Sequence, residues 1–232
     1  MKKLLIIAAL SAVLTAGSGP AQAADECDGL MVCVPVSGPW VVVPTNGAVP
    51  RRTVEYQLTC PRGYIVGGLD AELSDRGIDI SFIGSLGSPV NPGITTGRSV
   101  VFVASYVGTT AQAPTFRPYV GCMPASGGGR IPTAVQRIVK PGHPTIRRVR
   151  RARVVPGANT VMSTCRARET LVGASHAVGF GTRQPPSAAV TDNVTAAQTV
   201  RGRRVVVSVR ADAELGRIRA IVQAHAVCSG VK

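Results

Sequence analysis

Aromatic and acidic residues are scarce in this chain of 232 residues. Aromatic residues make up 4% of it, so a buried core has to be built mainly from Val, Ile, Leu and Ala. Only 12 Asp and Glu stand against 26 Lys and Arg, while 45% of the residues are hydrophobic. This composition is too apolar for a disordered chain. The length is sufficient for one large domain or two small ones.

Long apolar runs are also lacking, except near the N-terminus. There, two lysines precede the apolar run Leu4–Ala16, and Ala21-Gln22-Ala23 provides a small-x-small cleavage site. The run is shorter than the roughly 20 residues that span a membrane. The next cysteine, Cys27, does not directly follow the cleavage site, which argues against a lipid anchor. We therefore expect a signal peptide over residues 1–23 and a secreted, periplasmic or envelope-located mature chain without a transmembrane segment.

Most of the remaining sequence alternates between apolar and polar residues with a period of two. Turn-forming residues interrupt these runs, and 26 Gly with 17 Pro argue against long helices. Many short strands with frequent turns predict an all-β fold of antiparallel sandwich or barrel-like units. The clearest predicted strands, rich in β-branched residues, are Ile78–Ile83, Ser99–Tyr106, Arg203–Arg210 and Arg217–Val227.

Six cysteines in an exported chain predict disulfide bonds. Many pairings are conceivable, but the spacing favours Cys27 with Cys33, Cys60 with Cys122, and Cys165 with Cys228. The two long separations, 62 and 63 residues, are nearly equal and indicate an internal duplication. A disulfide that closes such a loop stabilises a fold by roughly 3–4 kcal/mol in chain-entropy estimates. The alternative is one domain whose cysteine spacing is incidental.

The residues around the cysteines support the duplication. Ile65–Ala71 follows the first cysteine of one pair, and Leu171–Ala177 follows that of the other, with one residue inserted in the second. A strand-like run precedes the second cysteine of each pair. We expect two homologous β units, each with one long-loop disulfide: residues 24–125, which include a short N-terminal segment with Cys27 and Cys33, and residues 145–232, joined by a Gly- and Pro-containing linker at 126–144.

A short pattern carries a family resemblance. Cys60-Pro61-Arg62-Gly63, followed by Val66-Gly67-Gly68 and a closing cysteine, resembles secreted bacterial β repeats with two cysteines each. The second unit is similar in Leu171-Val172-Gly173 and its closing cysteine, but Arg166-Ala167-Arg168 departs from Pro-x-Gly. The likeness covers most of the mature chain. It implies a disulfide-bonded β fold, and it implies no activity because none is assigned to such repeats.

The positive charge is concentrated in the second unit. Residues 24–129 carry 6 Arg against 8 acidic residues, and residues 130–232 carry 18 Lys and Arg against 4 acidic residues. Of these 18 cations, 16 are Arg, whose planar guanidinium fits phosphate, sulfate and carboxylate groups. The charge predicts an anionic partner for this unit. The alternative is a charge that only solubilises the protein and protects sheet edges.

Strand alternation selects candidate anion ligands. In the two predicted C-terminal strands, which we expect side by side, Arg and His share one face and apolar residues the other. The run Arg147–Arg153 puts charge on both faces, so it is either an edge strand or an exposed segment. The predicted anion-binding residues are Arg148, Arg150, Arg204, Arg210, Arg217, Arg219 and His225.

Nucleic acid is not expected as a specific ligand. The second unit has a single aromatic residue, Phe180, whereas proteins that bind single strands stack bases on aromatic side chains. No helix-turn-helix or zinc-finger pattern is present. An anionic envelope polysaccharide or lipid headgroups are the expected partners. The opposite charges of the two units would also support self-association.

Catalytic and metal-binding patterns are not recognisable. The first unit has no His, so it cannot build a Ser/His/Asp arrangement, and the three histidines of the chain lack metal-ligand spacing. The acidic residues do not follow a calcium-loop pattern. We expect a non-enzymatic binding protein with no cofactor and no metal. The alternatives are a structural or protein-interaction module of the envelope and, third, a hydrolase.

Overall fold

Strands dominate the structure, a computed structural model that describes residues 27, 32–45, 52–83, 97–109, 112–125 and 145–230. In these residues helix is limited to α2 (Ala188–Asp192) and the 3-10 turn η1 (Ala213–Arg217), and neither is long enough to cross a membrane. The all-β prediction is confirmed. The predicted signal peptide and linker lie outside the described residues.

The described chain falls into a first half, up to residue 125, and a second half, residues 145–230. The first half contains β1 (Val34–Ser37), β2 (Trp40–Val42), β3 (Val54–Thr59), β4 (Tyr64–Leu73), β5 (Ile78–Ile83), β6 (Ser99–Tyr106) and β7 (Thr115–Pro124). The second half contains β8 (Thr145–Val154), β9 (Gly157–Thr164), β10 (Glu169–Phe180), β11 (Val194–Arg201), β12 (Arg204–Ala211) and β13 (Ala220–Gly230).

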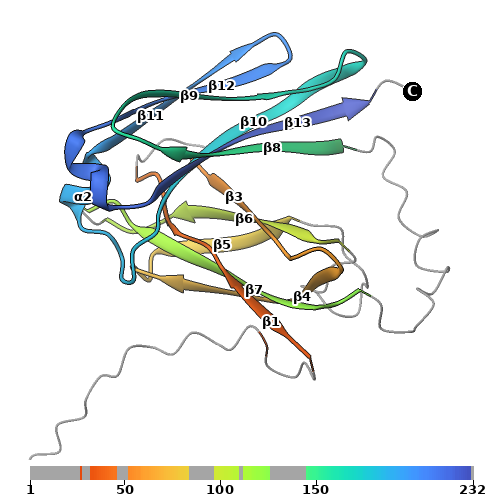
Figure 1. Cartoon of the computed structure of the whole chain (residues 1–232), viewed down its shortest axis with the longest axis horizontal. Helices are drawn as coiled ribbons and strands as arrows, with labels where there is room; N and C mark the ends of the chain where they lie inside the picture. The colour runs from red at the N-terminus through yellow and green to blue at the C-terminus, as the bar shows by residue number, and fades with distance from the viewer. Residues whose placement is uncertain are drawn as a thin grey trace, which may run out of the picture.

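One antiparallel sheet of seven strands runs through both halves in the order β1-β7-β2-β10-β13-β8, with β4 also paired to β7. A three-stranded sheet in the order β3-β6-β5 belongs to the first half, and another in the order β11-β12-β9 belongs to the second. Figure 1 shows the β11–β12–β9 sheet at the top of the molecule and the sheets of the first half below it. Each small sheet covers part of the large one and encloses a core.

The strand pairings in the two halves follow the same pattern. β7 pairs with β4 as β13 pairs with β10, and β6 and β12 are the central strands of the two small sheets. Both β4 and β10 contain a bulge directly after the residue opposite the second cysteine, which is Val66 opposite Cys122 and Leu171 opposite Cys228. Counted from these pairings, Val66 corresponds to Leu171. The sequence alignment instead placed Ile65 opposite Leu171, one residue away from this correspondence.

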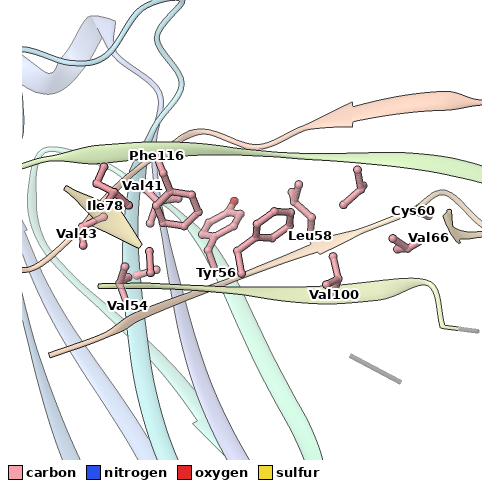
Figure 2. Close-up of a cluster of buried hydrophobic side chains, with 14 of the residues drawn as sticks. Val41, Val43, Val54, Tyr56, Leu58, Cys60, Val66, Ile78, Val100 and Phe116 are labelled. Atoms are coloured by element: carbon pink, nitrogen blue, oxygen red, sulfur yellow. The ribbon is translucent and has the colours of Figure 1, made fainter. Parts of the chain in front are cut away.

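The two cores differ in composition. The first contains Tyr56 and Phe116 among valines (Figure 2). It also contains Phe102, whose ring lies 6.4 Å from that of Phe116. The second consists mainly of Val and Ala, with Leu215, the disulfide-bonded Cys165 and Cys228, and one aromatic side chain, Phe180. Because Ala and Val are small, β12 packs closely against β13 through alternate buried residues such as Val205.

Three disulfides are present, and they are the predicted pairs Cys27–Cys33, Cys60–Cys122 and Cys165–Cys228. In each half, the long-loop disulfide joins the residue after the first strand of the small sheet to a strand of the large sheet. These four cysteines are buried. Such disulfides are typical of proteins in oxidising compartments.

One predicted strand is wrong at its start. Arg217–Val227 was expected as a single strand, but residues 213–217 form η1 and β13 begins at Ala220. The tight turn places Leu215 in the second core, where it is 2% exposed. The neighbouring β12 and β13 also belong to different sheets that pack face to face, rather than lying side by side in one sheet.

Replacing Cys165 and Cys228 together by Ala should lower the free energy of unfolding by about 3–4 kcal/mol, because the disulfide restricts a long loop in the unfolded chain. Urea unfolding followed by circular dichroism measures the loss. The matched control replaces Cys27 and Cys33, which are separated by only 6 residues and should cost less. Equal losses in the two variants would contradict the loop-closure explanation.

Candidate anion-binding face

Most arginines of the second half point into solvent. Residues 145–230 contain 14 Arg and 4 acidic residues, and 12 of these arginines are exposed. The other two, Arg147 and Arg148, form the ion pairs found in the described part of the chain, with Glu55 and Glu169. The exposed arginines therefore keep their guanidinium groups available to an external anion.

The outer face of the β11–β12–β9 sheet has an unusual composition. Alternation along β12 buries Val205, Val207 and Val209 in the core, so the residues between them face outward. Strand register then defines the whole face, which contains no acidic and no aromatic residue. We call it the outer face, and it consists of Arg201, Arg204, Arg210, Thr160, Thr164, Thr195, Thr199, Ser208, Ala158, Ala197, Val206 and Met162.

Further arginines gather at one end of the outer face. The β11–β12 turn passes through Gly202, whose φ of +58° lets Arg201 and Arg203 flank a tight reversal. The backbone N–H of Cys165 donates to the Arg203 carbonyl at 3.0 Å, which holds this turn against the β9–β10 connection. The two turns bring together what we call the arginine end: Arg166, Arg168, Arg201, Arg203 and Arg204, all of them exposed.

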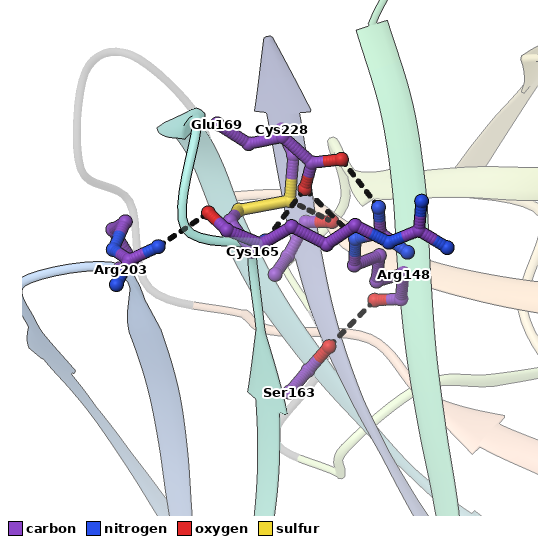
Figure 3. Close-up of a disulfide and its surroundings, with 8 residues drawn as sticks. Arg148, Ser163, Cys165, Glu169, Arg203 and Cys228 are labelled. Atoms are coloured by element: carbon purple, nitrogen blue, oxygen red, sulfur yellow. Dashed lines mark hydrogen bonds and ion pairs between the residues drawn. A yellow bond between two sulfur atoms is a disulfide. The ribbon is translucent and has the colours of Figure 1, made fainter. Parts of the chain in front are cut away.

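A single carboxylate lies at this end, and it is already engaged. Glu169 pairs with Arg148, whose Nε donates to it at 3.0 Å, and it accepts the backbone N–H of Arg166 at 2.7 Å (Figure 3). The hydrogen bond from Arg148 is the main cause that lowers the pKa of the Glu169 carboxyl. Glu169 therefore stays charged and occupied by Arg148, and it leaves the five side chains of the arginine end without a carboxylate partner within the described residues.

The predicted anion ligands divide into two groups. Arg204 and Arg210 lie on the outer face, near its opposite ends, as the alternation predicted. Arg150 is exposed on β8, which is the edge strand that the sequence offered as one of two alternatives. Arg217 lies in η1 and Arg219 precedes β13, so neither is part of a strand face.

Two other predicted ligands are engaged within the protein. Arg148 is held by Glu169, and His225 is 0% exposed. The sequence showed only one apolar face on β13, but the opposite face is covered by β3 of the first half. His225 was therefore wrong as a ligand for an external anion.

Sequence reasoning also missed the arginine end. Arg166, Arg168, Arg201 and Arg203 were not among the predicted ligands, because their two turns lie more than 30 residues apart in the chain. The only local signal is the Arg-Gly-Arg-Arg sequence of the β11–β12 turn. Its proximity to Arg166 depends on a long-range contact, in which the Arg203 guanidinium donates to the Arg166 carbonyl.

A buried polar network joins the two halves around His225. Arg147 donates to His225 Nδ1 at 3.1 Å, so this nitrogen accepts and Nε2 carries the proton that it donates to Gln223 Oε1 at 2.9 Å. The Gln223 amide in turn makes two bonds of 2.9 Å with the backbone N–H and carbonyl of Gln57 on β3. Burial first, and then the charge of Arg147, lower the pKa of His225 to about 4.

Glu55 completes this network. It accepts from Arg147 and from the Ser175 hydroxyl. Burial acts to raise its carboxyl pKa, but the hydrogen bonds from Arg147 and Ser175 outweigh burial and lower it. Ser175 thus donates to a carboxylate rather than to a histidine, and His225 is shielded from solvent. The Ser, His and Glu present here are not arranged as a nucleophile with its general base.

Cys165, Glu169 and Cys228 are the one grouping of potential metal ligands in the described chain. Their two sulfur atoms are joined as a disulfide, so no thiolate is available to a metal in the oxidised protein.

Comparison with known proteins provides no relative for the chain: no family model, no curated protein and no solved structure matches it.

The buried His225 should make stability depend on pH. The unfolded chain protonates this residue near pH 6.5, whereas the folded chain does so only near pH 4. The stabilisation is therefore complete above pH 6.5 and is lost as the pH falls towards 4, by roughly 3 kcal/mol in total. Urea unfolding between pH 7 and pH 4 should show a shallower dependence for His225→Gln than for the wild type. Equal slopes would contradict the assignment.

Removing one partner of the Arg147–Glu55 pair should leave a charge that is largely buried. Arg147→Met is expected to lower the free energy of unfolding by about 2–4 kcal/mol, because the Glu55 carboxyl loses the partner that offsets its burial. The double variant Arg147→Met, Glu55→Gln should recover at least half of that loss. If the two substitutions simply add, the pair does not stabilise the contact between the halves.

Proposed function

We propose that this chain is an exported, non-enzymatic binding protein whose Arg-rich second half contacts an anionic polymer of the cell envelope. The observation that carries the proposal is the outer face, which presents Arg201, Arg204 and Arg210 with five hydroxyl side chains and no carboxylate. Arginine is the side chain best suited to phosphate, sulfate and carboxylate groups. The three disulfides and the leader-like N-terminal sequence support the proposed export.

The spacing of the arginines favours a polymer over a small anion. Arg204 and Arg210 are six residues apart on one strand, which corresponds to roughly 20 Å. No single phosphate or carboxylate reaches both positions, whereas a chain with repeated negative charges does. Between them, Ser208 and the neighbouring Thr160 and Thr199 offer hydroxyl groups to the same chain.

We also infer that the two halves arose by duplication and that only the second acquired the cationic surface. Equivalent strand pairings, equivalent bulges and equivalent disulfides support this inference. The likeness to secreted two-cysteine β repeats stays a prediction beside it.

A second candidate is a structural or protein-interaction module whose charge only solubilises the protein. It is favoured by one observation: exposed arginines are not confined to the outer face, since Arg153, Arg183 and Arg219 lie elsewhere on the second half. The two candidates differ in whether the position of an arginine matters or only the number of arginines.

Charge reversal at matched positions separates these candidates. One variant carries Arg201→Glu, Arg204→Glu and Arg210→Glu, and the control carries Arg153→Glu, Arg183→Glu and Arg219→Glu, so both have the same net charge. Binding to poly(glycerol phosphate) teichoic acid, lipopolysaccharide, heparin and duplex DNA is measured across salt concentrations.

The outer-face variant should lose at least tenfold in affinity for one envelope polymer at 0.15 M salt, a loss of about 1.4 kcal/mol or more. The control should lose clearly less. Equal losses in the two variants, with all polymers released together as salt increases, would show generic charge attraction and contradict the proposal.

A further inference from the structure

A cleft lies where the two halves meet, away from the outer face. It has a volume of about 690 Å³. Five consecutive residues of β10, Ala174 to Val178, line it. Successive side chains of a strand point to opposite faces, so consecutive residues line a cleft together only when it lies against the edge of the strand. The cleft therefore faces the edge of β10 that is turned away from β13.

The backbone of β10 is unpaired along this edge. The N–H of Gly181 donates to the Arg219 carbonyl at 2.7 Å, so the odd-numbered residues of this part of β10 bond towards β13. The N–H and carbonyl groups of Ala174 and His176 then point into the cleft. Within the described residues they have no protein partner, because the pairing of β2 with β10, at Gly179 and Phe180, reaches no further along this edge than Val178.

A second strand edge borders the same cleft. Both backbone groups of Gln57 bond to the Gln223 side chain, so they point away from the neighbouring β6. By the same alternation, the backbone groups of Glu55, two residues earlier, point towards the cleft that this residue lines. The cleft thus lies between two strand edges with unpaired backbone groups.

The cleft continues a ladder that β2 begins. β2 runs antiparallel to β10 but ends at Val42, and Pro44 has no N–H to donate. An extension of β2 in the same register would occupy the space beside His176 and Ala174. The cleft, which Val42 and Pro44 also line, lies in that space.

The polar side chains of the cleft, other than the exposed Arg52 and Thr53, bond within the protein. His176 Nδ1 bonds with Gln198 Oε1 at 3.1 Å, and the Ser175 hydroxyl donates to Glu55. The free hydrogen-bonding capacity is therefore mostly that of the backbone, at the spacing of a β ladder. The walls are formed by small or β-branched side chains, such as Ala174, Ala177 and Ala196.

We propose that this cleft binds an extended peptide segment of a partner protein, which joins β10 as an added strand. A peptide supplies alternating N–H and carbonyl groups at the required spacing, and pockets lined by Ala and Val admit small side chains. The site is separate from the outer face, so this proposal and the anion-binding proposal stand or fall independently.

The test begins with a displayed library of random octapeptides selected on the oxidised protein. The best peptide is synthesised, together with two versions N-methylated at alternate residues. Because N-methylation removes hydrogen-bond donors on one edge only, one version should lose at least about tenfold in affinity and the other should not. Hydrogen exchange should slow at Ala174 and His176 when the peptide is bound.

Two substitutions fill the cleft, and a third substitution is the matched control. Ala196→Trp lies on the cleft wall, and Thr53→Trp overhangs the cleft from an exposed position that leaves the core intact. Ala197→Trp introduces the same side chain one residue further along β11, on the outer face. The first two should weaken peptide binding about tenfold or more, and the control should leave it unchanged.

Three results would overturn the proposal. They are a library that yields no peptide weakened by Ala196→Trp or Thr53→Trp, equal binding of the two N-methylated versions, and a dimer of the protein that dissociates on Thr53→Trp. The last result would place a second copy of the chain in the cleft. Reversal of Arg201, Arg204 and Arg210 should not affect peptide binding, which keeps this test distinct from that of the outer face.

Discussion

Burial of alternate valines along β12 determines both the packing of the second half and the position of its arginines. Val205, Val207 and Val209 are 0–1% exposed and pack against β13. Because neighbouring side chains of a strand point in opposite directions, Arg204 and Arg210 have to face solvent. A shift of one residue in the register would place the arginines in the core, so the same constraint that stabilises this half also fixes its outer face.

The contact between the halves combines apolar packing with polar bonds, since Ala177 of β10 belongs to the first core and Val42 of β2 packs against the second. β2 and β10 pair over only two residue pairs, and the remaining contact includes the Gln57–Gln223 bonds and the Glu55–Arg147 ion pair. The Gln223 side chain bonds to the backbone N–H and carbonyl of Gln57 at the open edge of β3, as a neighbouring strand would. Where neither β2 nor such a side chain reaches, the edges of β3 and β10 have no partner strand among the described residues, and the cleft between the halves lies there.

Sequence patterns predicted the features that depend on local alternation or on cysteine spacing. β12 has an uninterrupted period of two, and its faces were predicted correctly, as were the three disulfides. The prediction failed where a tertiary contact intervenes. Leu215 packs into the core through a 3-10 turn, which a strand pattern does not show.

The face of β13 that carries His225 shows the same limit. Its polar residues follow the pattern of a solvent-exposed face. Nothing in the local sequence indicates that β3 covers this face and that Gln223 bonds to β3. The arginine end was missed for a related reason, since Arg166 and Arg203 meet through a long-range hydrogen bond. Local patterns thus indicated how strongly cationic the second half is, while tertiary contacts decide which arginines act together.

Protection of individual arginines by a bound polymer tests the central claim most directly. The protein is treated with phenylglyoxal in the presence and absence of teichoic acid, and the modified residues are quantified by mass spectrometry. A polymer bound along the outer face should protect Arg201, Arg204 and Arg210, while Arg153, Arg183 and Arg219 react as in the free protein. Equal protection of both groups, or protection of the second group alone, would contradict it.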